Sequence, residues 1–219
     1  MPLLSLAALA FAVDYDAFRV ALAAEAGWET VGTKPMDGGG SVLIRHKVVS
    51  GEDCLEGSTA ANFPADVMLA VASDVTNQPK WSSFEVSRAV RLSQGADAFD
   101  YYQLLENPFP IHDRYWFVHA TVGRRGDDRV FTWQAVDAPK LYAKQVAALL
   151  VDFPDAVETA LNVGDWTFTP STDATRIRYR ICTDAGGHIP AWAGEYAARS
   201  TLPTNLSDLV GEVRRRVGG

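Results

Sequence analysis

Thr175-Arg-Ile-Arg-Tyr-Arg-Ile-Cys-Thr183 leads through Asp184-Ala-Gly-Gly187 into His188-Ile-Pro-Ala-Trp192, and this run decides the fold. In its first part isoleucine and tyrosine alternate with arginine, a pattern typical of a half-buried strand. From there to Val217, apolar residues recur at helical spacing. The sequence therefore predicts a strand, a turn and a long terminal helix. A helix laid across a curved antiparallel sheet leaves a space between the two, and the content of that space is the functional question.

The composition is that of one globular domain. The chain has 219 residues, of which 47% are hydrophobic, and we expect residues 14–217 to form a single domain with a full core or a core with a cavity. Its formal net charge of −7 argues against a nucleic-acid partner, which needs a basic surface. We expect a monomer that needs no cofactor.

The N-terminus, residues 1–13, is open to two interpretations. Leu3 to Ala12 is an apolar run ending in Ala10-Phe-Ala12, similar to the apolar region and cleavage site of a secretory signal. No Lys or Arg precedes it, so it is either a signal remnant or an apolar lead-in to the first helix. The first interpretation predicts a bacterial-type secreted or periplasmic protein, the second a cytoplasmic one.

The remaining elements alternate strands with turn sequences. We expect helices at 14–26 and 65–73, with a further short helix or ordered excursion at 141–150. Consecutive strands with short turns make an α+β fold with one antiparallel sheet of about nine strands, and we expect the helices at its two ends to pack on one face. The predicted strands are 28–34, 41–49, 54–62, 84–92, 98–105, 114–122, 129–136, about 157–169, and 175–183.

Three motifs resemble the START (steroidogenic-acute-regulatory-related lipid transfer) domain family, of the helix-grip superfamily. They are Ile111-His-Asp-Arg-Tyr-Trp-Phe-Val118 at a strand start, Gly164-Asp-Trp166-Thr-Phe-Thr-Pro170, and the turn Asp184 to Trp192. Leu202-Pro203 resembles a break inside the family's C-terminal helix. The resemblance extends roughly from Asp14 to Val217. It implies a helix-grip fold with an internal cavity, roofed by the last helix, that binds a hydrophobic ligand such as a lipid and transports it.

One position departs from the cholesterol-binding members of that family. These members carry an arginine that faces the cavity from the sixth strand, and the corresponding position here is Ala120. The same face of this strand reads Trp116, Val118, Ala120 and Val122, all of them apolar. A charged anchor for a sterol hydroxyl is therefore absent unless Gln103 or an arginine of the last strand replaces it.

The resemblance also indicates which residues line the cavity. Any single aromatic among them is more often a plain core residue, so the prediction is made for the group. Phe109 and Ile111, in the proline-containing loop 106–111, are expected at the cavity entrance, in reach of a transient membrane contact. The candidate ligand-binding residues are Tyr101, Gln103, Trp116, Val118, Ala120, Trp133, Tyr179, Trp192 and Tyr196.

No catalytic or metal-binding motif is found. His112 and Asp113 are adjacent on a strand and so point to opposite faces, which makes a structural contact between Asp113 and Arg114 the better interpretation. We therefore expect a binding protein and no enzyme. The alternatives are a polyketide cyclase or aromatase, which would need polar groups such as His119, Tyr101 or Arg178 inside the cavity, and an interaction domain without a cavity.

The two cysteines fit no metal-ligand spacing. In the helix-grip sheet the strands carrying Cys54 and Cys182 are antiparallel neighbours, so the resemblance implies that the two could form a disulfide. Two buried free thiols are the alternative.

Overall fold

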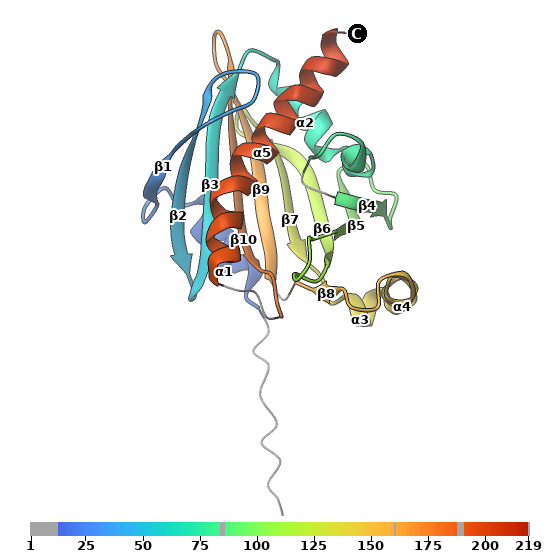
Figure 1. Ribbon diagram of the computed structural model, residues 1–219. Coiled ribbons are helices and arrows are strands. Elements are labelled where there is room, and N and C mark those ends of the chain that lie inside the picture. Colours follow the sequence, from blue (N-terminus) through green and yellow to red (C-terminus); the bar gives the residue numbers. More distant parts are fainter. Residues whose placement is uncertain (1–12, 84–85, 160, 188–190, 219) are drawn as a thin grey trace, which may run out of the picture.

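The computed structural model of the chain describes residues 13–83, 86–159, 161–187 and 191–218, and gives no side-chain description for residues 191–200. A curved sheet forms the body of the molecule, and the C-terminal helix α5 (Ala191–Gly218) runs across one of its faces (Figure 1). We call this the inner face and the opposite one the outer face. The strands are β1 (Glu29–Pro35), β2 (Ser41–Val49), β3 (Glu52–Ala61), β4 (Val86–Arg91), β5 (Ala98–Leu105), β6 (Arg114–Arg125), β7 (Asp128–Ala135), β8 (Val157–Glu158), β9 (Leu161–Pro170) and β10 (Thr175–Asp184).

The sheet runs in the order β1-β2-β3-β10-β9-β7-β6-β5-β4, with antiparallel neighbours throughout. The predicted strand at about 157–169 is wrong as a single element. Its first part is β8, which pairs in parallel with the start of β6 at Arg114 and Tyr115, where β7 does not reach. Its second part is β9, which pairs with β7 and β10.

The terminal helices lie on opposite faces of the sheet, so the expectation that both pack on one face is wrong. The side chains of Phe18 and Leu22, from α1 (Tyr15–Ala23), pack on Cys54, Val163 and Cys182 of the outer face. This face needs a cover because β3, β9 and β10 carry apolar residues on both of their sides. Asp14 caps α1 by accepting a hydrogen bond from the Ala17 amide at 3.0 Å.

Shorter helices complete the two layers. On the inner face, α2 (Ala65–Ser73) and the 3₁₀ helix η1 (Val75–Lys80) lie near the C-terminal half of α5. On the outer face, α3 (Ala138–Leu141) and α4 (Ala143–Asp152) cover β5 and β6, where Leu149 packs with Phe117 and Leu104. No helix of the described part of the chain is long and apolar enough to cross a bilayer.

The C-terminal half of α5 lies very close to the sheet. Its buried residues Leu202, Leu206, Leu209 and Val213 follow helical spacing. A Cβ atom at Gly57 of β3 would lie 3.0 Å from Leu206 Cδ1, so this glycine permits the close approach. The predicted break at Pro203 is not seen, because α5 continues through this residue.

Candidate functional site

The inner face of the sheet is apolar and rich in aromatic rings. Strand alternation brings every second residue of β5, β6, β7, β9 and β10 to this face, and the strand register aligns them in rows. These residues form one buried cluster with α2 and the C-terminal half of α5. The cluster includes Phe99, Tyr101, Val118, Ala120, Phe131, Trp133, Trp166, Phe168, Ile177 and Tyr179, with Trp116 packed against it.

Aromatic rings of neighbouring strands contact one another on this face. The ring centroid of Tyr179 lies 4.4 Å from that of Trp166 and 5.7 Å from that of Trp133. Trp133 fits here because β9 has a glycine opposite it, since a Cβ at Gly164 would lie 2.5 Å from Trp133 Cζ2. The glycine of the Gly164-Asp-Trp166 motif thus makes room for an indole ring.

Most polar groups of the inner face are paired with one another. Trp116 donates from Nε1 to Gln103 Oε1 at 3.0 Å, and Gln103 Nε2 donates to Gln78 Oε1 at 2.5 Å. Trp133 Nε1 donates to Asn162 Oδ1 at 2.8 Å. These indole and amide groups are satisfied without a ligand.

The phenols of Tyr101 and Tyr179 differ from these groups. Both residues are buried, and burial raises the pKa of each phenol; the neighbouring Tyr179 raises that of Tyr101 further. The two phenols are therefore neutral hydrogen-bonding groups at physiological pH. Among the described residues, the buried side-chain atoms that lack a hydrogen-bond partner include neither of these hydroxyls.

The arginines of β10 lie on the outer face, so none of them replaces the missing charge at Ala120. Arg180 is fully buried there and donates to Glu56 Oε2 at 2.7 Å, to Glu25 Oε1 at 2.7 Å and to the carbonyl of Leu22. Arg178 also bonds Glu25, at 2.9 Å. These contacts hold α1 against the sheet and do not reach the inner face.

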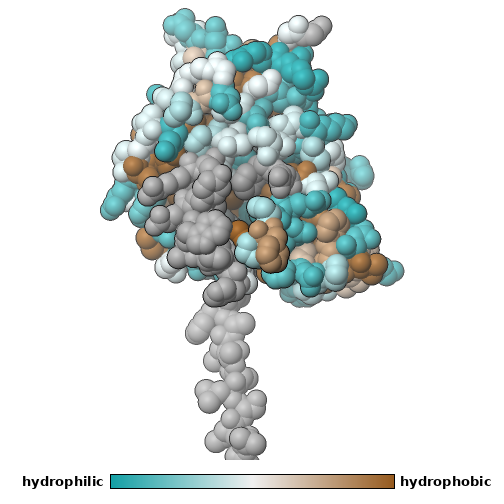
Figure 2. All heavy atoms as spheres, in the orientation of Figure 1, coloured by the Kyte–Doolittle hydropathy of each residue, from teal (hydrophilic) through white to brown (hydrophobic). Residues whose placement is uncertain are grey.

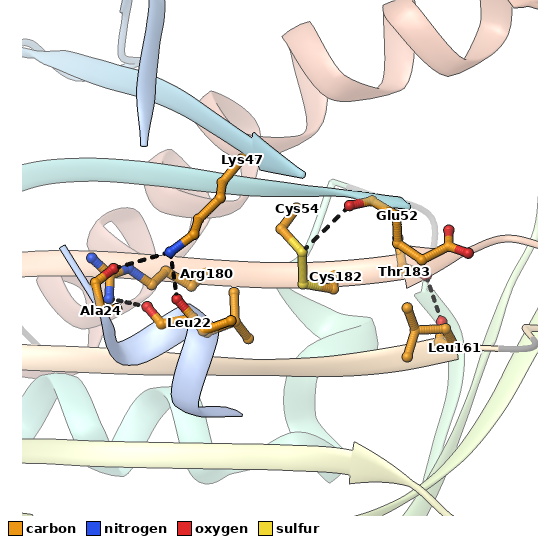
Figure 3. The surroundings of a disulfide bond; sticks show 10 residues. Leu22, Ala24, Lys47, Glu52, Cys54, Leu161, Arg180, Cys182 and Thr183 are labelled. Atoms are coloured by element: carbon orange, nitrogen blue, oxygen red, sulfur yellow. Dashed lines mark hydrogen bonds between the residues drawn. A yellow bond between two sulfur atoms is a disulfide. The ribbon is translucent and has the colours of Figure 1, made fainter. Parts of the chain in front are cut away.

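Next to this network the structure joins Cys54 and Cys182 by a disulfide (Figure 3). The two residues are opposite each other in the register of β3 and β10. Both are fully buried beneath α1, in the same cluster as Phe18 and Leu22. The bond fixes the end of β10 two residues before the strand ends at Asp184.

The loop between β5 and β6 carries an exposed aromatic residue. The side chain of Phe109 is 97% exposed, and Ile111 is half-buried. Together with Asp152 and Phe153 at the end of α4, they line a surface pocket of about 380 Å³.

Arg114 connects this loop with the turn that leads to α5. It is 4% exposed and donates to the carbonyls of Ala185 at 2.6 Å, Gly186 at 3.1 Å and His112 at 2.5 Å. The expected contact between Arg114 and Asp113 is made through the Asp113 carbonyl, to which Arg114 donates at 3.3 Å, whereas Asp113 Oδ1 accepts from the Asn107 amide. Desolvation lowers the pKa of Arg114.

The structure brings together the predicted ligand-binding residues that it describes. Tyr101, Gln103, Trp116, Val118, Ala120, Trp133 and Tyr179 all belong to the inner face. The side chains of Trp192 and Tyr196 lie outside the described residues, so the cavity that they would roof stays a prediction. Sequence reasoning missed Phe99 and Phe131, which strand alternation indicates, and Gln78 and Asn162, for which the sequence holds no signal.

Other candidates for chemistry lie away from this face. His119 Nδ1 is 2.6 Å from Asp100 Oδ1 on the outer face, and Tyr142 donates to the other Asp100 oxygen, which together with burial raises the pKa of Tyr142 to about 12. Burial of the Asp165 carboxylate raises its pKa, also on the outer face. Within the described residues, no group of three or more His, Cys, Asp or Glu could hold a metal ion.

Comparison with known proteins shows what the fold resembles. No family model matches the chain. An uncharacterized protein of Pseudomonas aeruginosa is 24% identical over 147 residues, which are 65% of this chain and 68% of that protein.

Three solved structures illustrate the likeness in fold. A STAR-related lipid transfer protein fragment of Xanthomonas axonopodis superposes with a TM-score of 0.69 at 21% identity, over 86% of this chain and 99% of the other. Human StAR-related lipid transfer protein 5 gives a TM-score of 0.67 at 15% identity, over 90% and 92%. The Zhui aromatase/cyclase of Streptomyces gives 0.52 at 14% identity, over 75% and 94%. With its curved sheet crossed by a C-terminal helix and matched in these structures, the chain has the START-like helix-grip fold.

Proposed function

We propose that the protein binds a lipid between the inner face and α5, and transfers it between membranes. The observation that carries this proposal is the separation of residue types across one sheet. The inner face is apolar and aromatic, whereas the arginines of β10 and their acidic partners lie outside. Burial of apolar ligand surface would contribute about 25 cal/mol per Å² to the affinity.

The route to the site runs between the β5–β6 loop and the turn before α5. Arg114 binds carbonyl groups of both segments, so the two cannot separate without breaking its hydrogen bonds. Ligand exchange requires these hydrogen bonds of Arg114 to break. The opening of such a contact often limits the rate at which a ligand is released.

The same end of the molecule is the proposed membrane contact. Phe109 is 97% exposed, and Val151 of α4, next to the pocket residue Asp152, is 81% exposed. Figure 2 shows hydrophobic side chains among hydrophilic ones at the corner that α3 and α4 form. Phe109→Ser should reduce the fraction of the protein that sediments with phosphatidylcholine vesicles. The control is Val20→Ser, which replaces an exposed valine on α1 and should leave this fraction unchanged.

Lipid extraction and native mass spectrometry of the purified protein test the proposal. We expect a co-purifying lipid, or uptake of lipid from vesicles, at one molecule per chain. Ala120→Leu adds bulk to the inner face and should lower lipid occupancy, whereas Thr121→Leu, its neighbour on the outer face, should not. A chain that neither carries nor takes up lipid would refute the binding function.

We propose binding without chemical change. His119 and Arg178, which a cyclase would need inside the cavity, lie on the outer face. The phenols of Tyr101 and Tyr179 hold their protons too tightly to act as bases, because burial raises their pKa. Recovery of a bound ligand with an altered mass after incubation would favour the enzyme instead.

A further inference from the structure

The surface pocket between the β5–β6 loop and the end of α4 has walls that the protein itself holds in place. In the loop, the Asn107 amide donates to Asp113 Oδ1 at 3.0 Å. The other wall is the segment after α4, in which the Ala156 amide donates to the Phe153 carbonyl at 3.1 Å. The Val157 amide donates to the Asp113 carbonyl at 2.9 Å and so joins the two walls. The pocket of about 380 Å³ is therefore a fixed part of the fold.

The lining of this pocket combines apolar surface with negative charge. Three acidic side chains line it, Asp113, Asp152 and Asp155, and no lysine or arginine is among its described lining residues. Its other titratable side chain is His112. The apolar part of the lining is Phe109, Pro110, Ile111, Phe153, Pro154 and Ala156. A concave surface with this charge attracts a cation and repels an anion.

The structure already places one cation beside an aromatic ring of the pocket. The Arg88 guanidinium lies over the ring of Phe153, with its Cζ 4.9 Å from the ring centroid, and its Nη1 is 2.8 Å from Asp152 Oδ2. A ring with a carboxylate beside it is a favourable environment for a positive charge. Asp155 is exposed two residues beyond Phe153 and forms no ion pair within the described part of the chain. A second cation from outside the protein can therefore pair with Asp155.

The surroundings of the pocket favour a membrane over a protein as the source of this cation. The exposed large apolar side chains of this corner, among the described residues, are Phe109, Leu141 and Val151. A stable protein interface covers about 800 Å² per partner around an apolar centre, which these separate side chains do not provide. Separate apolar side chains that enter the headgroup region suit a reversible membrane contact.

We propose that this pocket binds the ammonium group of a zwitterionic phospholipid headgroup while Phe109 enters the membrane beside it. This inference rests on the proposed function, because it assigns a headgroup preference to the membrane contact. The ammonium group pairs with the Asp155 carboxylate and lies against the apolar wall that includes Phe153. The pocket thus selects the membrane to which the protein binds, and not the lipid that the inner face carries.

Vesicles with three kinds of headgroup and matched acyl chains test the inference by sedimentation. Phosphatidylcholine is zwitterionic, digalactosyldiacylglycerol is uncharged and phosphatidylglycerol is anionic. An exposed ion pair and an exposed contact between a cation and a ring contribute about threefold each, so the protein should prefer phosphatidylcholine over digalactosyldiacylglycerol about tenfold. Phosphatidylglycerol should bind least, because the acidic lining repels it.

Variants of the pocket locate the preference. Asp155→Asn and Phe153→Leu should each reduce it about threefold, and the double variant should remove it while binding to digalactosyldiacylglycerol stays the same. The control is Asp173→Asn, which removes an exposed carboxylate in the turn between β9 and β10 and should leave the preference unchanged. Phe153 also packs on the cluster under α4, so melting curves check that Phe153→Leu is folded. Asp155→Asn changes an exposed residue and decides the question by itself if Phe153→Leu is unfolded.

The outcomes separate this inference from the proposed function. If the protein sediments equally with phosphatidylcholine and digalactosyldiacylglycerol, if it prefers phosphatidylglycerol, or if Asp155→Asn keeps the full preference, the headgroup pocket is wrong. Lipid occupancy measured by native mass spectrometry then still supports lipid binding by the inner face. If Asp155→Asn weakens binding of an arginine-rich peptide but not of phosphatidylcholine vesicles, the pocket is a protein-docking site and the proposal is wrong. If the protein sediments with none of the vesicles and carries no lipid, the proposed function itself fails, and the headgroup pocket with it.

Discussion

Removing the buried charge of Arg180 should destabilise the protein without changing its ligand binding. The Arg180 side chain is fully buried on the outer face, where it bonds Glu56, which is also fully buried, and Glu25. It also donates to the carbonyl of Leu22 in α1. Arg180→Met keeps most of the side-chain volume and leaves the Glu56 carboxylate with Arg45 as its remaining partner.

The expected loss follows from this burial. Breaking a buried ion pair by removing one partner costs about 3–5 kcal/mol, because the other charge stays buried. For a chain of this length each kcal/mol lowers Tm by about 2–4 °C, so the melting temperature should fall by about 6–20 °C. Replacing Glu56 as well, in the double variant with Glu56→Leu, should restore part of this loss, since well-packed apolar residues often substitute for a buried pair.

Differential scanning calorimetry at pH 7 measures the effect, with lipid occupancy determined on the same samples. Arg176→Met is the control, because Arg176 lies on the same face of β10 and is exposed. Its Tm should change by about 2 °C at most, since an exposed substitution costs roughly 0.5 kcal/mol or less. A small change in Tm for Arg180→Met together with a loss of lipid would refute the assignment of these arginines to the outer face.

Three more predictions concern the disulfide, two glycines of the sheet and the ion pairs of Glu212. Reduction of the Cys54–Cys182 disulfide, whose partners are 128 residues apart in sequence, should cost about 5 kcal/mol in the chain-entropy model and lower Tm by about 10–20 °C; two titratable thiols in the unreduced, denatured protein would show that the bond is not formed. Gly164→Ala should destabilise more than Gly57→Ala in urea unfolding. A Cβ at Gly164 would lie 2.4 Å from the Arg180 carbonyl oxygen and 2.5 Å from a Trp133 ring atom, whereas a Cβ at Gly57 would lie 3.0 Å from Leu206. Equal effects would argue against these close contacts at Gly164. Hydrogen bonds and charge from Arg215 and Arg216 lower the pKa of Glu212 in the folded protein. The stabilisation from these ion pairs is therefore present above about pH 4.3, the pKa of a glutamate in an unfolded chain, and is lost as the pH falls through the lowered pKa of the folded state. Glu212→Gln should lower Tm at pH 7 and have little effect at pH 2.5, and an equal loss of Tm at the two pH values would contradict the ion pairs.

Strand alternation explains how much of the site could be predicted from sequence. Residues i and i+2 of a strand share a face whatever the tertiary structure, so the apolar face of β6 and the arginine face of β10 follow from reading every second residue. The register of β5, β6, β7, β9 and β10 then aligns these faces, which is why Tyr101, Ala120 and Tyr179 lie on one surface.

Contacts to the backbone were not predictable in this way. The sequence predicts a contact between Arg114 and Asp113, but it does not reveal that the Arg114 guanidinium also binds the carbonyls of Ala185 and Gly186, which are 71 and 72 residues away. Any residue supplies a carbonyl, so no sequence pattern marks these acceptors. The side of the sheet on which α1 packs could not be predicted either, because β3, β9 and β10 have apolar residues on both faces.

The two faces of the sheet bury different kinds of group. On the outer face Arg180 and Glu56 are buried and paired with each other, and the disulfide lies beside them, so these groups stabilise the folded chain without a ligand. On the inner face the buried groups are mainly apolar and aromatic, with the rings of Tyr101 and Tyr179 among them. Such a surface binds a hydrocarbon chiefly by burying apolar area. Substitutions on the two faces should accordingly have separate effects, with loss of the Arg180 ion pair lowering Tm and added bulk at Ala120 lowering lipid occupancy.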